Sequence, residues 1–414
     1  MAIRDWDDPR DTSRAVQVRI AVIFHRFGPY HVARLAAAAK HSEITAIELS
    51  SDTNEYAWDT VAGSSGYERH TIFANGDSRD ASSKELERRI TNVLGAVKPD
   101  AVAVPGWSDK GALSAVLWCC RTDTPAVLMS ESSAHDERRT SWKEFLKRGL
   151  LQCYSAALVG GSLHKSYLES LGFPSERIFC GYDVVDNSYF ACEAAKAREQ
   201  KSEMLAKYSL PETYFLASAR FIEKKNLSML LRSYAKYREA AGPKALKLIL
   251  LGDGPLRQQL EGERAALHVE EAVMMPGFKQ YVDLPAYYAF ARAFIHPSTT
   301  EQWGLVVNEA IATGLPVIVS SRCGCVPELV RENFNGFTFD PDDTDSLASL
   351  FDRVSSLPTE EWERLSLGSR DIASQNGPER FAEGLKNAVK TALQFPPIRS
   401  TLSQRILLNS LLYR

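Results

Sequence analysis

Short apolar runs alternate along the chain with longer amphipathic stretches. A run that ends at glycine, proline or a polar turn predicts a strand, and a stretch with helical spacing predicts a helix. The first half has a predicted helix over His31–Lys40 and predicted strands over Val18–Phe24, Ala101–Val104, Ala126–Met129 and Ala156–Val159. The second half has a predicted helix over Leu227–Ala241 and predicted strands over Tyr214–Ala217, Leu246–Leu251, Val273–Met275, Ala293–His296 and Pro316–Val319.

This rhythm of strand and helix predicts the fold class. Strands that alternate with helices form parallel sheets with right-handed crossovers. Because the pattern occurs twice, we expect two Rossmann-like α/β domains, at residues 1–200 and 201–390, with a linker near residues 192–212 and a separate tail over residues 391–414. Two such domains bind ligands in the cleft between them, beyond the carboxyl ends of their strands.

Composition narrows the class of protein. The 414 residues are 44% hydrophobic and 24% charged, which is typical of a globular chain with an ordinary core. The net charge is −3 and neither half is strongly basic, so a general nucleic-acid binder is not expected. No apolar run is long enough to span a membrane, and the polar N-terminus does not resemble a signal peptide. We therefore expect a cytoplasmic protein with reduced cysteines.

The segment from His296 to Val317 carries the densest candidate chemistry. Glu301 lies in the loop after a predicted strand, and Glu309 lies eight residues later in a helix predicted to start near Gly304. The backbone amides of Gly304, Leu305 and Val306 would then be unpaired at a helix N-terminus, which favours phosphate binding. Carboxylates on both sides of such a site suit the hydroxyls of a sugar and a ribose. The alternative is that Glu301 caps the helix and Glu309 is solvated.

A second polar segment follows the predicted strand Tyr214–Ala217. Its Arg220 and Lys225 supply a planar fork of donors and a point charge, and both suit a diphosphate. A solvated basic loop is the alternative. The turn Gly252-Asp-Gly-Pro255, which follows the next strand, is by itself only a weak turn signal.

In order and spacing, these segments resemble the retaining glycosyltransferases of family 4, which have the GT-B architecture. The resemblance covers roughly residues 214–345 and is looser in the N-terminal half. It rests on Arg220 and Lys225, the Gly252–Pro255 turn, Gly277-Phe278, Leu284-Pro285 with Tyr288, His296-Pro-Ser, Glu301-x7-Glu309, Gly314-Leu-Pro316, Pro327-Glu328 and Asn335-Gly336.

The resemblance implies a role for each matching residue of the second domain. Glu301 would contact hydroxyls of the donor sugar near the reacting carbon, and Glu309 would hold the ribose hydroxyls. Arg220 and Lys225 would neutralise the diphosphate leaving group, together with the amides of Gly304–Val306. The nucleotide base would lie near Gly277, Phe278 and Lys279.

The resemblance extends to the first domain and to the tail. His135, in the loop after the strand Ala126–Met129, would orient the donor sugar, although a lone loop histidine is also commonly structural. The loop after the first strand has one glycine, Gly28, where the family often has two, so contacts of this loop with the donor phosphates are in doubt. The tail Thr401–Arg414 would return to pack on the first domain.

The resemblance also implies that no metal or other cofactor is required. Arg220 and Lys225 can supply the positive charge that Mg²⁺ supplies elsewhere. The aspartates at 340, 342, 343 and 345 form two Asp-x-Asp pairs late in the motif block, and we interpret them as a solvated turn. Cys323 and Cys325 have no second pair of ligands nearby and predict no metal site.

Two features bear on the acceptor and on membranes. The segment Arg138–Leu151 has aromatic and leucine residues near helical spacing and five basic residues, which fits an interfacial helix on anionic lipid at the inner face of a membrane. An amphipathic helix docked on its own domain explains the same pattern. Trp107 follows a strand and either stacks on an acceptor sugar or belongs to the core.

The sequence therefore predicts a retaining, metal-independent glycosyltransferase with a nucleoside-diphosphate sugar as donor. Its acceptor would be a hydroxyl of a growing glycan, a lipid-linked glycan or a small glycoside. One alternative is an inactive subunit that binds a nucleotide sugar. The others are an epimerase or a phosphorylase on the same architecture, and no motif for a cofactor-bearing lysine supports the phosphorylase.

Overall fold

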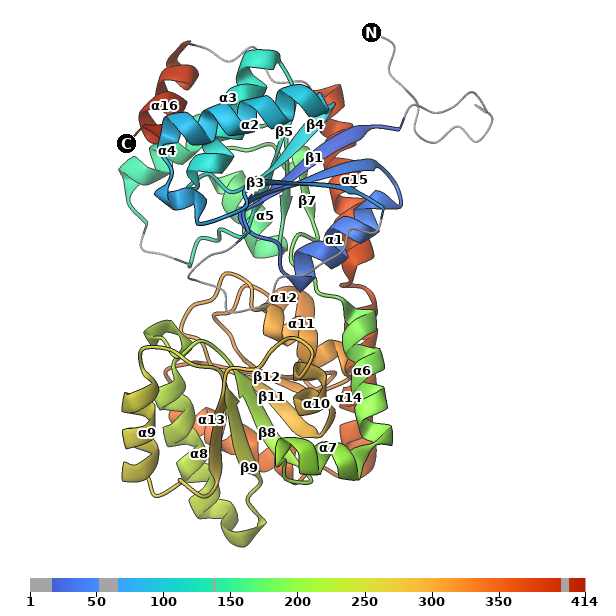
Figure 1. The fold of residues 1–414 in the computed structure, drawn as a ribbon. Helices are drawn as coiled ribbons and strands as arrows, with labels where there is room; N and C mark the ends of the chain where they lie inside the picture. Colours follow the sequence, from blue (N-terminus) through green and yellow to red (C-terminus); the bar gives the residue numbers. More distant parts are fainter. Residues whose placement is uncertain (1–16, 52–65, 137–138, 396–401, 414) are drawn as a thin grey trace.

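The computed structural model describes residues 17–51, 66–136, 139–395 and 402–413. The chain forms two domains, each built on a parallel sheet and stacked one above the other in Figure 1. The first sheet has the strand order β3-β2-β1-β4-β5-β6-β7, and the second has the order β10-β9-β8-β11-β12-β13. The predicted pair of parallel α/β domains is confirmed.

The strands of the two sheets have the following bounds. The first sheet contains β1 (Arg19–Phe24), β2 (Glu43–Ser50), β3 (Glu68–Phe73), β4 (Ala101–Pro105), β5 (Ala126–Ser130), β6 (Ala156–Val159) and β7 (Ile178–Cys180). The second contains β8 (Tyr214–Ser218), β9 (Lys247–Leu251), β10 (Val273–Gly277), β11 (Ala291–His296), β12 (Val317–Ser320) and β13 (Gly336–Phe339).

Helices lie on both faces of each sheet. The first half of the chain contains α1 (Pro29–Ala39), α2 (Ser83–Val97), α3 (Lys110–Thr122), α4 (Ser141–Leu151), α5 (Ser162–Ser170), α6 (Asn187–Glu199) and α7 (Lys201–Tyr208). The second contains α8 (Leu227–Ala241), α9 (Arg257–Ala266), α10 (Leu284–Ala289), α11 (Leu305–Ala312), α12 (Val326–Leu329), α13 (Thr344–Ser355), α14 (Thr359–Ser374), α15 (Pro378–Gln394) and α16 (Leu402–Leu412).

Every strand predicted from an apolar run is present, with ends that differ by at most two residues. The pattern did not predict β2, β3, β7 and β13. Strand β2 contains a buried carboxylate, Glu48, that is neutralised from β3: Arg69 and Thr71 donate to Glu48 Oε1 at 2.7 and 2.8 Å. A charged residue inside a buried strand interrupts the apolar run from which the strand would be predicted. Strands β7 and β13 have only three and four residues.

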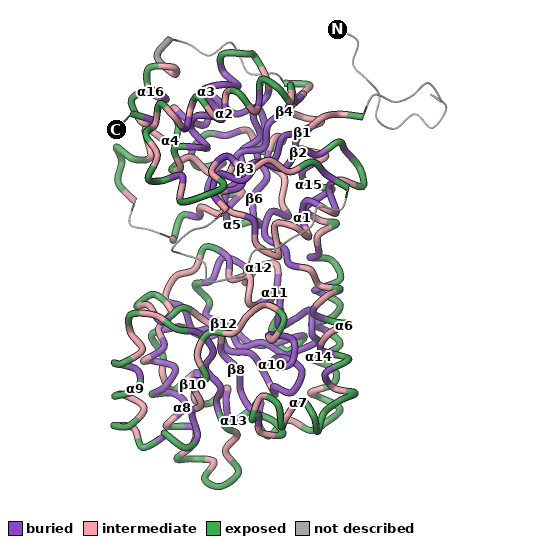
Figure 2. The backbone as a smooth tube through the Cα atoms, in the orientation of Figure 1, coloured by how far each residue is buried: buried purple, intermediate pink, exposed green. Residues whose placement is uncertain are grey.

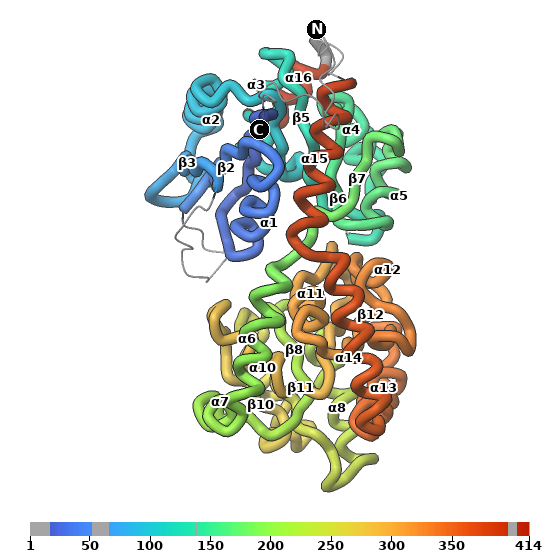
Figure 3. Tube along the Cα trace, turned by 90° about the vertical axis from the view of Figure 1, so that its right-hand side faces the viewer, coloured from blue at the N-terminus to red at the C-terminus, as the bar shows by residue number. Residues whose placement is uncertain are grey.

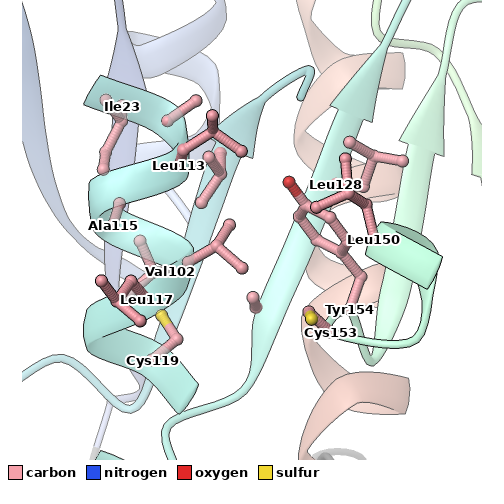
Figure 4. Close-up of a cluster of buried hydrophobic side chains, with 14 of the residues drawn as sticks. Ile23, Val102, Leu113, Ala115, Leu117, Cys119, Leu128, Leu150, Cys153 and Tyr154 are labelled. Carbon is pink, nitrogen blue, oxygen red and sulfur yellow. The ribbon is translucent and has the colours of Figure 1, made fainter. Parts of the chain in front are cut away.

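The core of each domain lies between its sheet and the helices. The strands are almost entirely buried, whereas the outer sides of the helices are exposed (Figure 2). One cluster in the first domain packs α3 and α4 against the sheet, with Leu113 and Leu150 facing Val102 and Leu128 (Figure 4). Each such fully buried side chain stabilises the fold by about 1.5–3 kcal/mol.

The C-terminal segment crosses between the domains. Helices α6 and α7 pack with the second domain, against α10 and α11, while α15 returns to cover α1 and strands β5 to β7 of the first (Figure 3). Residues 187–200 and 378–390 therefore pack with the opposite domain from that given by the expected boundaries. The expected linker at residues 192–212 is largely helical. Helix α16 packs on α3 and α4 of the first domain; Thr401 and Arg414 lie outside the described residues.

The carboxyl ends of the two sheets face each other across the domain boundary. The Thr300 hydroxyl, after β11, donates to the backbone oxygen of His135, after β5, at 3.1 Å. The Gln302 amide donates to Asp136 Oδ2 at 3.2 Å. The loops that carry the candidate chemistry therefore converge on one region between the domains.

Candidate functional site

The centre of the site lies where the strand order of the second sheet reverses. Strands β8 and β11 are adjacent, and the loops that follow them carry Lys225 and Glu301. Lys225 Nζ donates to Glu301 Oε2, and Lys224 Nζ lies 3.3 Å from Glu301 Oε1. Such a reversal point is where open α/β sheets bind their ligands.

Glu301 is held in a polar enclosure at the edge of the core. Its side chain is 11% exposed. His296 Nε2 lies 3.6 Å and Ser298 Oγ 3.4 Å from the same carboxylate oxygen that pairs with Lys225. Burial opposes ionisation, but the nearby His296 imidazole and the charge of Lys225 outweigh it and hold the pKa of Glu301 well below its usual value. Glu301 is therefore a carboxylate at any physiological pH.

Gly304 links this carboxylate to the start of α11. It has φ of 107°, a conformation that favours glycine, and an added Cβ would lie 3.2 Å from His296 Nε2. Leu305 and Val306 form the first turn of α11 and are half-buried. The predicted helix start is confirmed. The carboxylate of Glu301 pairs with the lysines, which gives no support to its alternative role as a helix cap.

Glu309, in the middle of α11, is fully enclosed. It is 1% exposed, so the alternative of a solvated Glu309 is wrong. Tyr30, at the start of α1 in the first domain, donates to Oε1, and Tyr288 of α10 donates to Oε2 at 2.7 Å. Burial raises the pKa of Glu309 to about 7, against the two tyrosine hydrogen bonds, which lower it.

The basic loop after β8 is braced by the Gly252–Pro255 turn. An added Cβ at Gly252 would lie 1.8 Å from the Ala219 carbonyl oxygen, so only glycine permits this approach of the two strand ends. The Phe221 amide donates to the Asp253 carbonyl at 2.8 Å. The turn thus positions the loop that carries Arg220, whose side chain is exposed.

The expected base region lies at the end of β10. Gly277 has φ of 84° and its carbonyl accepts a hydrogen bond from the Gly252 amide at 3.0 Å. Phe278 is 38% exposed, and Lys279 Nζ lies 5.8 Å from the centre of the Tyr287 ring. An exposed aromatic ring at the carboxyl end of a strand is compatible with stacking on a base.

The first domain supplies two of the expected residues. The side chain of His135 is exposed, and its backbone lies against Thr300, next to Glu301. Gly28 is the N-cap of α1, and its amide donates to His31 Nδ1 at 3.0 Å. Its φ of −116° is open to other residues, and an added Cβ would make only an ordinary contact with His31. The backbone conformation therefore gives no reason for glycine at residue 28.

A cavity of about 360 Å³ lies between the domains, beside Glu301. Trp107 and Lys147 contribute to its wall, and the Lys147 ammonium lies 5.7 Å from the centre of the Trp107 ring. Its full lining is Trp107, Ser108, Ser132, Asp136, Lys147, Lys224, Thr300, Glu301 and Gln302. The cavity borders both sheets at their carboxyl ends and is large enough for a small ligand.

Among the described residues, no cluster of three or more histidine, cysteine or acidic side chains could hold a metal. Arg322 pairs with the exposed Asp340 and Asp342, and Asp343 caps α13. The Asp-x-Asp segment is thus a surface turn. Cys323 and Cys325 are buried free thiols.

Sequence reasoning did not identify Tyr30 or Lys224 as parts of this site. Tyr30 reaches Glu309 from the other domain, 279 residues away, and no local pattern could reveal that pairing. Lys224 is adjacent to Lys225 and contacts the same carboxylate, so the paired lysines were a usable signal.

Comparison with known proteins identifies the family. The family profile described as "Glycosyl transferases group 1" matches residues 200–371. An uncharacterised glycosyltransferase of Methanocaldococcus jannaschii, MJ1607, is 30% identical over 321 residues, which cover 75% of this chain and 80% of that protein. The putative colanic acid biosynthesis glycosyltransferase WcaL of Escherichia coli is 28% identical over 226 residues, which cover 53% of this chain but only 51% of WcaL.

Solved structures agree on the fold. The Anabaena protein HepE, solved in complex with UDP and glucose, superimposes with a TM-score of 0.65 at 18% sequence identity and covers 89% of this chain and 98% of its own. At this identity the likeness establishes the GT-B fold. The Methanocaldococcus relative is 30% identical over most of both chains, and the family profile matches residues 200–371. The chain therefore belongs to the group 1 glycosyl transferases.

Proposed function

We propose that the protein is a retaining, metal-independent glycosyltransferase of the family 4 type. It transfers a sugar from a nucleoside-diphosphate sugar to a hydroxyl of an acceptor glycan, lipid-linked glycan or small glycoside. The observation that carries the proposal is the ionised Glu301, held by Lys224, Lys225 and His296 at the strand reversal point and followed by the buried Glu309.

The proposed donor site uses four features of the second domain. The ribose hydroxyls bond to Glu309, and the diphosphate lies between Lys225, Arg220 and the first amides of α11. The base lies against Gly277 and Phe278. HepE was solved with UDP and glucose, which supports a nucleoside-diphosphate sugar as the ligand class.

The proposed reaction takes place on one face of the donor sugar. The bond between the anomeric carbon and the diphosphate oxygen breaks, and the acceptor oxygen forms its bond on the same side. The proton of the acceptor hydroxyl passes to the departing phosphate oxygen. Lys225 and Arg220 stabilise the negative charge that develops on the leaving group, so the residues present can do the work of a divalent cation. Glu301 and His135 orient the sugar.

The acceptor enters the cavity beside Glu301 in this proposal. Trp107 offers an aromatic ring on the wall of that cavity, and such rings stack well on sugars. The name of WcaL refers to colanic acid biosynthesis, which supports a growing polysaccharide as the acceptor class.

We also propose that the protein works at the cytoplasmic face of a membrane through α4. Trp142 and Phe145 are 56% and 75% exposed on the outer face of this helix, beside the exposed cations Lys143 and Arg148. The inner face docks on the domain through Leu150 and Leu151, so the alternative of a docked amphipathic helix accounts for only half of the pattern. Arg138 lies outside the described residues.

A docked helix alone has no need of two exposed aromatic side chains beside cations, whereas an anionic lipid surface attracts both. Among the described residues, no helix has both the length and the apolar character that crossing a bilayer requires.

The test of the proposed function is a turnover screen. The protein is incubated with sugars of UDP, GDP and ADP, with and without EDTA, and release of the nucleoside diphosphate is measured. Turnover with one donor that EDTA leaves unchanged supports the proposal. Binding without turnover or transfer would favour the inactive nucleotide-sugar-binding subunit.

A further inference from the structure

The carboxylate of Glu309 is closed over by hydroxyl groups from both domains. Tyr288, in α10 of the same domain, donates to Oε2 at 2.7 Å, and Tyr30, in α1 of the other domain, donates to Oε1. Both oxygens are therefore engaged, and the residue is 1% exposed. A ribose cannot reach a carboxylate that is covered in this way, so one of the covering groups has to move before a nucleotide binds there.

The two tyrosines differ in their freedom to move. Tyr288 is 0% exposed within the core of the second domain, and its ring packs edge-on against Phe190 and at an angle to Phe294. Tyr30 is only half-buried and is fixed to the first domain. Displacing Tyr288 would disrupt a packed core, whereas displacing Tyr30 needs only a change at the domain boundary.

Tyr30 also touches the boundary through its ring. The ring meets that of Tyr281 edge-on, with centroids 5.9 Å apart, and Tyr281 in turn stacks on Tyr189 at 4.7 Å. Tyr189, Tyr281 and Tyr30 itself are partly buried side chains that pack against the hydrophobic core of the second domain. The position of Tyr30 thus depends on how the two domains are placed, while that of Tyr288 does not.

We propose that Tyr30 is a latch on the donor site: its hydroxyl occupies Glu309 when no donor is bound, and the ribose hydroxyls of the donor displace it. This inference rests on the proposed role of Glu309 as the ribose-binding carboxylate. The Tyr30 hydroxyl gives Glu309 Oε1 a hydrogen-bond donor, which this buried oxygen would otherwise lack. Because Tyr30 belongs to the first domain, donor binding must also break a contact between the domains. Part of the binding free energy of the donor is then used to break that contact.

The variant that tests the latch is Tyr30→Phe, which keeps the ring packing on Tyr281 and removes the hydroxyl. The covered state then loses one hydrogen bond to Glu309. We expect the affinity for a nucleoside diphosphate to rise by about 3- to 10-fold, the range that one net hydrogen bond supplies. The measurement is titration calorimetry with UDP, GDP and ADP, each added separately to wild type and variant.

The matched control is Tyr288→Phe, which removes the other hydroxyl from the same carboxylate without touching the domain boundary. We expect no gain in affinity from this variant. The 2′,3′-dideoxy form of the nucleotide that binds is the second control. Because it lacks the hydroxyls that compete with Tyr30, it should bind Tyr30→Phe and wild type equally well.

The possible results separate the latch from the donor site itself. If Glu309→Gln and removal of the ribose hydroxyls both weaken binding, but Tyr30→Phe weakens it or leaves it unchanged, the latch is wrong and the donor site stands. If Glu309→Gln binds the nucleotide as tightly as wild type, and the dideoxy form binds as tightly as the ribose form, Glu309 does not hold the ribose. The proposed latch, which depends on that role of Glu309, is then also wrong.

Discussion

The ammonium group of Lys225 and the carboxylate of Glu301 form an ion pair although 76 residues separate them in the chain. Each follows one of two adjacent strands, β8 and β11, at the reversal point of the second sheet. The pair keeps Glu301 ionised and oriented in a partly desolvated site. It also places a cation beside the proposed path of the diphosphate, so that one contact joins the proposed sugar-binding and leaving-group parts of the site.

Glu301→Gln should abolish most turnover while the fold is kept. The amide retains the size of the side chain but loses the charge that pairs with Lys225 and that orients the donor sugar in the proposed site. We expect kcat to fall by about 10²- to 10³-fold, as for removal of a preorganised electrostatic contact. The measurement is the initial rate of donor turnover, with thermal unfolding as a check on folding.

The matched control for that variant is Glu270→Gln. Glu270 is exposed and precedes β10, at the end of the sheet opposite the site. Its turnover should equal that of wild type. A Glu301→Gln enzyme with unreduced kcat would show that the site is misassigned.

Nucleoside diphosphates should stabilise the protein without a metal. At a ligand concentration of 100 times Kd the gain is about 2.7 kcal/mol, and EDTA should not reduce it. Lys225→Ala should weaken binding by about 10- to 100-fold, because a charged hydrogen bond to the diphosphate contributes about 1.5–3 kcal/mol. Thermal-shift titrations with UDP, GDP and ADP measure both effects.

A more exposed lysine in an ordinary surface ion pair provides the comparison. Lys236 pairs with Asp345 on the surface at 2.6 Å, and Lys236→Ala should leave the shift intact. A ligand-induced shift that disappears in EDTA, or that survives unchanged in Lys225→Ala, would be evidence against the metal-free diphosphate site.

Glu309 should make the stability of the unliganded protein fall as pH rises. Burial raises the pKa of Glu309 to about 7, from an ordinary value near 4.5, so the folded state binds this proton more tightly than the unfolded state. The stabilising contribution is complete below pH 4.5 and is lost as pH rises through 7. Urea unfolding from pH 5 to 8 should show wild type losing stability relative to Glu309→Gln, which does not titrate. Parallel curves for the two proteins would contradict the raised pKa.

The exposed aromatic residues of α4 should bind anionic membranes. A Trp142→Gln/Phe145→Gln double variant should lose flotation with vesicles of mixed phosphatidylglycerol and phosphatidylcholine, and wild-type binding should weaken with salt. Leu367→Gln removes a side chain that is 62% exposed on α14 of the second domain, and it should float like wild type. Equal flotation of the double variant and wild type would show that α4 does not bind membranes through Trp142 and Phe145.

Local sequence patterns predicted most of the strands but not how distant segments pack together. Apolar runs located most strands because a buried parallel strand needs no polar face. The same rule missed β2, whose Glu48 is neutralised by Arg69 from a neighbouring strand. It also could not show that α15 returns to the first domain, since an amphipathic helix does not specify which sheet it covers.

The sequence predicted candidate residues on several separate segments, but not which of them contact one another. Glu301 and Glu309 were found because one strand–loop–helix unit carries both. Their partners come from elsewhere: Lys225 from another strand end, Tyr288 from another helix and Tyr30 from the other domain. Such pairings are set by tertiary structure. For this reason the sequence alone did not predict that Tyr30 and Tyr288 cover the Glu309 carboxylate.

The central claim is that this site transfers a sugar with retention of configuration and without a metal. The most direct measurement is proton NMR of donor turnover in EDTA, with UDP-, GDP- and ADP-sugars, which reads the anomeric configuration of the first product formed. The account predicts a product with the configuration of the donor and a rate unaffected by EDTA. An inverted product, or turnover that requires a divalent cation, would contradict it.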